Sequence, residues 1–313
     1  MDNFGQIHRF DEVTEIRQVV QRFGFDVCYT QISPGQLEVE SYEVRLGDCL
    51  VYREKYGCHM VAHGSSTPEG FGVMLAQSGE SRFFGHDLSP KRVVLFPPKC
   101  EIDAVGFPGS ILLHLLLPKD RLLAEAANCD VKLAQSSRAL VVEPGFDRLH
   151  HLRSLMQQAA ETLDRRDLAA WQESEPDLVA LFLGLFDAAG IQALDPAKSS
   201  GQAAEYAIRV RDHIHLSPLD QLDMAALSRD LDVGRHHLNR CFREHFGVSI
   251  HEFVHLCRLH RARDFLAAST LHQTVTEVAY SCGFNHLGRF STEYRQLFGE
   301  TPSQTLGKAA TST

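Results

Sequence analysis

The chain has no long apolar segment and no visible export signal. None of its apolar runs approaches the roughly 18 residues that a membrane-spanning helix needs. The nearest, Ile111–Pro118 (ILLHLLLP), is far too short. The opening sequence MDNFGQIHRF contains neither a basic nor an apolar region, so it is unlike a secretory signal. We therefore expect no membrane segment and a cytoplasmic location.

The sequence also lacks paired cysteines and clustered histidines. Its eight cysteines include no CxxC pair, which indicates reduced, buried thiols rather than disulfides or a zinc site. Cys58 and His59 are adjacent, which is poor spacing for a shared metal. His63, His86 and His114 are isolated, and the sequence contains no Gly-rich phosphate loop. We predict no catalytic residue, metal or cofactor, and keep a metal-dependent oxygenase or isomerase as the alternative.

Positive charge is scarce in the chain as a whole, whose formal net charge is −9. From residue 205 onward, however, basic and acidic side chains are equal in number, so the excess of acid belongs to residues 1–204. Arginines cluster twice in this neutral part, and local positive potential of this kind is what phosphate contacts need. The clustered arginines are Arg235, Arg240, Arg243, Arg258, Arg261 and Arg263.

The most informative feature present is a repeated helical unit. The segment Val233–Gly247 (VGRHHLNRCFREHFG) returns 52 positions downstream, within Cys282–Gly299 (CGFNHLGRFSTEYRQLFG). In each copy large apolar residues recur at i, i+4 and i+8, which marks one face of an α-helix, and a Gly suited to a left-handed C-cap follows. The matched pairs are Leu238 with Phe290, Phe242 with Tyr294, Arg243 with Arg295, Phe246 with Phe298 and Gly247 with Gly299.

A short helix and a tight turn precede each copy. The pattern predicts helices over Met224–Leu231, with Asp223 as N-cap, and over Val275–Cys282, where Thr274 and Glu277 form a capping box. Two short helices joined by such a turn make a helix-turn-helix, whose second helix can enter the major groove of DNA.

A longer helix connects the two units. It begins at Ser249, with Glu252 completing another capping box, and its apolar pattern runs to about Ala268. At 1.5 Å per residue this helix is about 30 Å long, close to the roughly 34 Å of one DNA turn. The spacing therefore predicts two reading helices in successive major grooves.

These residues resemble the DNA-binding domain of the AraC/XylS family of transcription regulators. The resemblance covers about Glu205 to Leu306 and includes both reading helices, the RLHRARDFL run of the connecting helix and the closing TPSQTL segment. It implies an α+β protein of two domains, with a cupin-like antiparallel β barrel and flanking helices before an all-α double helix-turn-helix. It also implies a ligand-responsive activator of a catabolic or metabolic operon, which binds double-stranded promoter DNA and contacts RNA polymerase.

The candidate DNA-binding residues lie on the exposed faces of the two reading helices. Those on the first helix are Arg235, His236, Asn239, Arg240 and Arg243, and those on the second are Leu287, Gly288, Ser291, Thr292 and Arg295. The resemblance places His236, Asn239 and Arg240 at base-reading positions, while Arg235, Arg243 and Arg295 suit the DNA backbone. Gly288 inside a helix is explained either by close approach to DNA or by tight packing against another helix.

The N-terminal part has the pattern of a small antiparallel barrel or sandwich. A helix at Asp11–Arg22 is followed by short alternating runs separated by Gly, Pro and Asp. Ser78–Pro98 resembles a cupin-like sensor domain, for which a small-molecule effector of unknown identity is expected; a cupin-type metal enzyme stays open. The predicted strands are Leu37–Leu46, Cys49–Tyr56, Phe71–Gln77, Arg82–Gly85, Arg92–Phe96 and Ser110–Leu117.

We divide the chain into four segments: a sensor domain (1–145), a helical segment (146–193), a linker (194–204) and the DNA-binding domain (205–313). The apolar stripes of the helical segment suit packing on the sensor domain or a two-fold dimer seam. The family resemblance favours a homodimer. Control by a partner protein, in place of a small molecule, is the alternative within the same fold.

Overall fold

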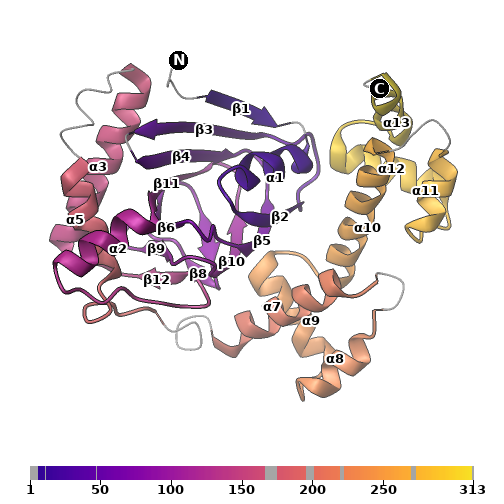
Figure 1. The fold of residues 1–313 in the computed structure, drawn as a ribbon. Helices are drawn as coiled ribbons and strands as arrows, with labels where there is room; N and C mark the ends of the chain where they lie inside the picture. Colours follow the sequence, from indigo (N-terminus) through magenta and orange to yellow (C-terminus); the bar gives the residue numbers. More distant parts are fainter. Residues whose placement is uncertain are drawn as a thin grey trace.

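A computed structural model describes residues 6–10, 12–46, 48–165, 175–194, 201–218, 222–268 and 273–311. The strands lie together in the N-terminal part of the chain, and the helices after residue 201 form a separate group beside them (Figure 1). The predicted fold class, a two-domain α+β protein with an all-α C-terminal domain, is therefore confirmed.

The N-terminal domain consists of two antiparallel sheets that do not close into a barrel. The seven-stranded sheet has the order β1-β3-β4-β11-β6-β9-β12, and the five-stranded sheet has the order β2-β5-β10-β7-β8. The strands of the first are β1 (Gln6–Phe10), β3 (Val39–Leu46), β4 (Cys49–Tyr56), β6 (Gly70–Ser78), β9 (Val93–Phe96), β11 (Ser110–Pro118) and β12 (Leu140–Val142). Those of the second are β2 (Asp26–Gln31), β5 (Met60–Ser65), β7 (Ser81–Phe83), β8 (His86–Asp87) and β10 (Glu101–Gly106).

Among the described residues, four helices accompany these sheets. Helices α3 (Phe146–Arg165) and α5 (Glu175–Phe186), on the left of Figure 1, bury their apolar stripes with α2 (Lys119–Asn128) against the seven-stranded sheet. Helix α1 (Val13–Gln21) packs on β2. The residues that α3 and α5 bury in this core include Leu152, Leu155, Met156, Leu178, Phe182 and Phe186. Packing on the chain's own sheet thus accounts for both stripes, and the dimer seam stays a prediction.

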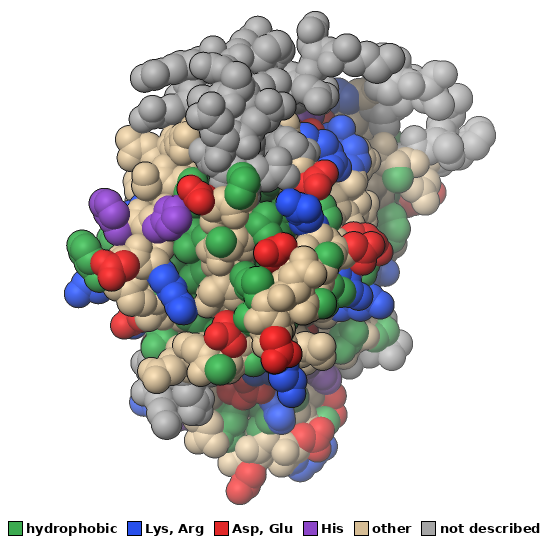
Figure 2. Space-filling model, turned by 60° about the vertical axis from the view of Figure 1, so that its left-hand side comes forward, with side chains coloured by type: hydrophobic (Ala, Val, Ile, Leu, Met, Phe, Trp, Pro, Cys, Tyr) green, Lys and Arg blue, Asp and Glu red, His purple; other side chains and the backbone are tan. Residues whose placement is uncertain are grey.

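The side of the molecule that carries α3 and α5 comes forward in Figure 2. Lysine and arginine, acidic and hydrophobic side chains are interspersed there, and no large area of one charge gathers on the described surface of this face. A surface of this composition does not by itself mark an interface, because contiguous apolar patches are the usual sign of one.

The described residues of the C-terminal domain form seven helices with two small cores. Phe242, Phe246 and Phe253 lie in the core around the first reading helix, and Phe290, Tyr294 and Phe298 in the core around the second. In Figure 1 the two reading helices, α9 and α12, lie toward opposite ends of the connecting helix α10. The helices are α7 (Gly201–Leu216), α8 (Met224–Asp230), α9 (Arg235–Phe246), α10 (Ile250–Ala267), α11 (Val275–Ser281), α12 (Leu287–Phe298) and α13 (Pro302–Thr311).

The predicted helix ends are confirmed by their hydrogen bonds. Asp223 accepts from two backbone amides at the start of α8, and Ser249 and Thr274 form complete capping boxes with Glu252 and Glu277. The glycines after α9 and α12 have φ angles of +78° and +74°, the left-handed conformation that a C-cap glycine supplies without a Cβ clash. Local chemistry therefore fixes both helix-turn-helix units.

The structure describes the two ends of the predicted linker, residues 194–204. Residues 201–204 form the first turn of α7, and Leu194 donates a backbone hydrogen bond to Val141 of β12 and packs on the sensor core. Residues 195–200 lie outside the described residues. Helix α7 contacts both domains, because Ile208 belongs to the sensor core while Ala207 and Val210 belong to the first helix-turn-helix core.

Candidate nucleic-acid interface and sensor cavity

The first reading helix, α9, exposes the basic face that the sequence predicts. Leu238 and Phe242 are fully buried, whereas Arg235, His236 and Arg240 are exposed. Arg243 is also exposed, near the C-terminal end of the helix. The guanidinium of Arg240 lies 2.8 Å from His237 Nδ1 and 3.9 Å from Glu244, contacts within the helix that leave it at the surface. The exposed face therefore has donors available for bases and phosphates.

Asn239 differs from the other predicted contacts. It is half-buried, and its Oδ1 accepts a hydrogen bond of 3.0 Å from the backbone amide of Ile250, the first residue of α10. A bidentate contact to adenine uses both the amide oxygen and the amide nitrogen. To contact adenine with both atoms, Asn239 would have to share its Oδ1 between the base and the Ile250 amide, or break the hydrogen bond to Ile250. Its role in base reading stays a prediction.

The second reading helix, α12, offers fewer polar groups. Leu287 and Ser291 are half-buried, Leu287 against the second core, while Thr292 and Arg295 are exposed. The Thr292 hydroxyl donates to the carbonyl of Gly288 at 3.0 Å. A threonine hydroxyl used in this way has less capacity for a base contact. The geometry suits positioning on the DNA backbone better than extensive base reading.

Gly288 is exposed, and packing does not explain it. A Cβ placed on Gly288 would have no atom within 4 Å apart from its chain neighbours and its own helix backbone. Close packing against another helix, one of the two explanations left open by the sequence, is therefore wrong within the described residues. Arg289, one residue on, pairs with Glu293 at 2.8 Å on the same helix.

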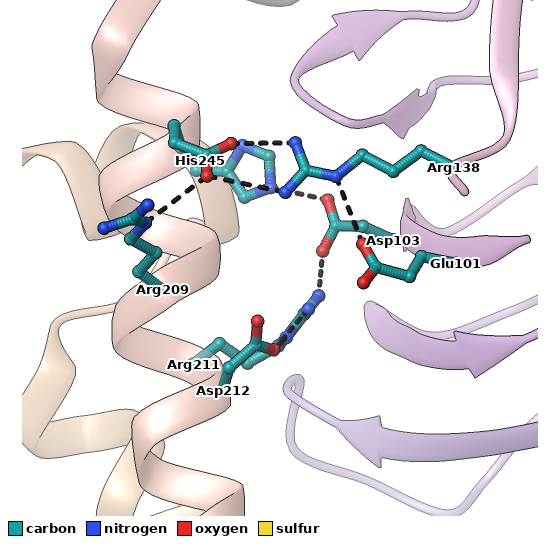
Figure 3. A network of polar contacts seen from close by, with 8 residues as sticks. Glu101, Asp103, Arg138, Arg209, Arg211, Asp212 and His245 are labelled. Carbon is teal, nitrogen blue, oxygen red and sulfur yellow. Dashed lines mark hydrogen bonds and ion pairs between the residues drawn. The ribbon is translucent and has the colours of Figure 1, made fainter. Parts of the chain in front are cut away.

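The sensor domain holds the C-terminal end of α9 through a buried polar network. Asp103 of β10 bonds Arg211 of α7, and its other carboxylate oxygen lies 3.0 Å from His245 Nε2 of α9. Figure 3 shows these side chains pointing toward one another across the domain boundary. Burial acts to raise the pKa of the Asp103 carboxyl, but the charges of Arg211 and His245 outweigh it and hold the pKa below its usual range.

Further contacts reach the terminal carbonyls of both reading helices. Arg82 of β7 donates to the carbonyls of Glu244 and His245 at 3.0 and 2.8 Å. The Gln31 side chain donates to the carbonyl of Leu297, at the end of α12, at 3.2 Å. Donors at a helix C-terminus satisfy carbonyls that have no partner within the helix. These contacts are made at the C-terminal ends of the helices, whereas the N-terminal residues of a recognition helix are the ones that contact base edges.

Sequence reasoning missed these interface residues. Asp103, Arg138 and Arg211 attracted no prediction, and β10, which carries Asp103, was not recognised as a strand. Arg138 pairs with Glu205 at 2.9 Å and with Glu101 at 3.1 Å. The sequence contains one usable signal, which is Asp103 among the apolar residues of EIDAVG (Glu101–Gly106). A charged residue at a buried strand position needs a partner, so it indicates a polar contact there.

A cavity of about 70 Å³ lies between the two sheets of the sensor domain. Its wall is largely aromatic and aliphatic, and its polar groups come mainly from strands β2, β4 and β11. The lining includes Tyr29, Tyr52, Glu54, Tyr56, Phe96 and His114. His114, which the sequence suggested as a core or pocket histidine, is thus a pocket histidine, and Glu54 is the one carboxylate in the lining.

Neither a metal cluster nor a membrane-spanning helix is found among the described residues. No group of three or more His, Cys, Asp or Glu side chains in the described ranges is arranged to hold a metal ion. None of the helices in those ranges is long and apolar enough to cross a bilayer. Cys58, His59 and His63, whose spacing was weighed above, form no such group.

Comparisons with known proteins match the C-terminal part of the chain. A model described as a helix-turn-helix domain matches residues 227–308. The HTH-type transcriptional regulator GlxA of Rhizobium meliloti (strain 1021) is 38% identical over 81 residues, which cover 26% of this chain and 24% of that protein. The XylDLEGF operon transcriptional activator 2 of Pseudomonas putida is 41% identical over 66 residues, covering 21% of this chain and 42% of that protein.

Among solved structures, the AraC-like transcriptional activator CuxR aligns with 82% of this chain and 94% of its own, at 14% identity and a TM-score of 0.44. The curated matches have a narrower extent: the matched segment spans about a quarter of the GlxA regulator and less than half of the XylDLEGF activator. The helix-turn-helix match covers residues 227–308, where both reading helices lie.

Proposed function

We propose that this chain is a promoter-binding transcription regulator of the AraC/XylS type with a small-molecule sensor, because residues 227–308 match a helix-turn-helix domain. The observation that carries the proposal is the pair of exposed N-terminal halves of α9 and α12, at opposite ends of one connecting helix (Figure 1). Two such helices can occupy successive major grooves on one face of a duplex.

The sensor role rests on the contacts between the domains. The five-stranded sheet touches both reading helices at their C-terminal ends, through Asp103 and Arg82 for α9 and through Gln31 for α12. A shift of these strands changes the positions of α9 and α12. A ligand that binds one arrangement of the sensor domain more tightly than another biases DNA binding by that difference in affinity.

We further propose that the regulator is a homodimer and that it activates transcription. A homodimer would place two such domains on a promoter with two half-sites, and an activator would contact RNA polymerase there. The relatives' names include transcriptional activators of operons, which favours activation of a catabolic or metabolic operon. We propose no enzymatic activity and a cytoplasmic location. Control by a protein partner stays the second candidate, since the interdomain contacts would transmit either signal.

Footprinting on the promoter upstream of the chain's own operon tests the DNA-binding proposal. The full chain should protect two segments about one helical turn apart, and a fragment comprising residues 200–313 should protect the same two segments. Protection of a single segment by both proteins would show that α12 is structural only. Absence of sequence-specific protection with either protein would refute the regulator proposal.

A further inference from the structure

Glu54 is a buried carboxylate in the wall of a largely apolar cavity. It lies on β4 with 4% of its surface exposed. Tyr52 donates to its Oε1 at 2.7 Å and Tyr56 to its Oε2 at 2.8 Å. His114 Nε2 lies 3.4 Å from the same Oε2, an ion-pair distance at which the two atoms are not aligned as a hydrogen bond. Strands β4 and β11 thus fix the carboxylate in place.

The carboxylate has room for one more donor. Two carboxylate oxygens accept about four hydrogen bonds. Each tyrosine hydroxyl occupies one position, Tyr52 on Oε1 and Tyr56 on Oε2, and His114 lies beside Oε2, so the position that faces no neighbouring donor is on Oε1. Burial acts to raise the pKa of Glu54, but His114 and the two hydroxyls outweigh it and lower the pKa, which keeps the group ionised at neutral pH. An anion buried in this way attracts a cation or a strong donor.

The walls of the cavity suit an organic cation better than a hydrated metal ion. Tyr29, Tyr52, Tyr56 and Phe96 line it, with Phe23, Phe25 and Phe83 completing the aromatic part. Aromatic faces attract ammonium groups through their quadrupoles, and cages of this kind recognise substituted ammonium ions. The surrounding aliphatic side chains offer no ligands to replace the water shell of a metal ion, which fits the lack of a metal cluster among the described residues.

The volume limits the size of the guest. An apolar cavity of roughly 150 Å³ holds benzene, which has six non-hydrogen atoms. This cavity measures about 70 Å³, about half of that value. It therefore accommodates about three to five non-hydrogen atoms without rearrangement. Ligands of this size bind no tighter than a dissociation constant of about 3 μM, because each non-hydrogen atom contributes at most about 1.5 kcal/mol of binding free energy.

We propose that this cavity is the effector site and that it binds a small organic ammonium ion, whose N–H group donates to Glu54 Oε1 while its alkyl part contacts the aromatic wall. This inference rests on the proposed sensor function and names the chemical class of the effector. The β4 and β11 strands that carry Glu54 and His114 belong to the seven-stranded sheet, and the opposite wall includes Ile102 and Ala104 of β10. Asp103, which holds α9, lies between those two residues.

The test compares three probes of equal size with the full-length protein: isopropylammonium, isopropanol and acetate. Each has four non-hydrogen atoms, and they differ in charge. Isopropylammonium at millimolar concentration should raise the unfolding temperature of the protein in a saturable manner, with a dissociation constant that calorimetry confirms. Isopropanol and acetate should not. Tetrabutylammonium should also fail, because it exceeds the cavity. This comparison uses the unaltered protein and does not depend on how a variant folds.

Two variants assign the effect to the cavity. Glu54→Gln should weaken isopropylammonium binding about tenfold or more, since it removes a charge-assisted hydrogen bond. Glu40→Gln, on the neighbouring strand β3, is the matched control, because its carboxylate pairs with Arg9 outside the cavity. The control should bind isopropylammonium with unchanged affinity. Equal responses to ammonium and alcohol, an unchanged response in Glu54→Gln, or no response to any ammonium probe would each overturn the proposal.

Promoter binding measured on the same samples separates this inference from the proposed function. Sequence-specific DNA binding without an ammonium response would overturn the effector assignment and leave the regulator proposal intact. An ammonium response without sequence-specific DNA binding would refute the regulator proposal. Support for both requires that isopropylammonium changes promoter affinity in the unaltered protein and in Glu40→Gln, and not in Glu54→Gln.

Discussion

Replacing Asp103 by asparagine is the perturbation that most directly tests how the two domains are held. The substitution keeps the size of the side chain and removes its charge. In the folded protein Asp103 is 1% exposed, and Arg211 and His245 both contact its carboxylate. Arg211 is itself 4% exposed, so the substitution leaves a buried guanidinium without its principal partner.

The size of the effect follows from burial. Removing one partner of a buried ion pair costs about 3 to 5 kcal/mol, because the remaining charge is uncompensated. Arg211 keeps a contact of 2.6 Å with Asp212, whose side chain is 44% exposed, and the substituted side chain still offers an amide oxygen. We therefore expect the lower end, a loss of about 3 kcal/mol in the free energy of unfolding. Asp212→Asn, which removes the exposed partner of the same guanidinium, should cost less than about 1 kcal/mol.

Urea denaturation of the full chain, followed by fluorescence and circular dichroism, measures both losses. The pKa of Asp103 is lower in the folded protein than the ordinary value of 3.8. Its stabilising effect is therefore fully present above pH 3.8 and is lost as the pH falls through the lower folded value. The difference between the unaltered protein and Asp103→Asn should be constant from neutral pH to about pH 5 and shrink below pH 3.8. Equal losses for the Asp103 and Asp212 variants, or a difference that vanishes near neutral pH, would refute the reasoning.

Three further predictions concern single side chains. His236→Ala and Arg240→Ala should each weaken promoter binding by about 1 to 3 kcal/mol in fluorescence anisotropy, and unchanged affinity in both would remove α9 from base reading. Gly288→Ala should raise the free energy of unfolding by up to about 1 kcal/mol and weaken promoter binding, since nothing in the protein fills that space; unaltered DNA affinity would argue against close approach of DNA. Cys129, the exposed cysteine, should supply the single thiol that reacts rapidly with a disulfide reagent, and Cys129→Ser should abolish that fast phase.

Local signals in the sequence predicted most of the C-terminal domain. The caps at Asp223, Ser249 and Thr274 determine where helices begin, and the two C-cap glycines determine where α9 and α12 end. These are contacts between residues within a few positions of each other, so a single sequence is sufficient to recognise them. Even the left-handed turn at Asp232, with a φ angle of +52°, follows from the tolerance of Asp for that conformation.

The five-stranded sheet was harder to predict because its pattern depends on the fold. Of its strands, β2, β5, β8 and β10 were missed, as were β1 and β12 of the seven-stranded sheet, whereas all six predicted strands exist with ends that differ by a few residues. The face of β10 that carries Asp103 is covered by α7 and α9 from the C-terminal domain. A polar residue at such a position is stable only with partners that lie 108 and 142 residues away in the chain. No local pattern encodes a pairing of that range.

The position of the interdomain contacts constrains how a signal reaches DNA. The sensor domain binds the C-terminal ends of α9 and α12 and leaves exposed residues such as Arg235 and His236 uncovered. It therefore does not compete with DNA for the reading faces. It instead fixes the position of each reading helix, and the proposed binding in successive grooves depends on the spacing between the two helices.

The free energy needed for switching can be compared with that of the contacts between the domains. Switching a regulator fully between two arrangements requires about 5.5 kcal/mol of differential affinity. If the Asp103 network is present in one arrangement only, it supplies part of this amount, less than the roughly 3 kcal/mol lost in Asp103→Asn, because that loss includes the cost of a buried charge without a partner. The hydrogen bonds from Arg82 and Gln31 to helix carbonyls contribute in the same direction. Loss of Asp103 should then reduce the dependence of promoter binding on effector more than it reduces promoter binding itself, and a variant with wild-type induction would show that the switch does not pass through α9.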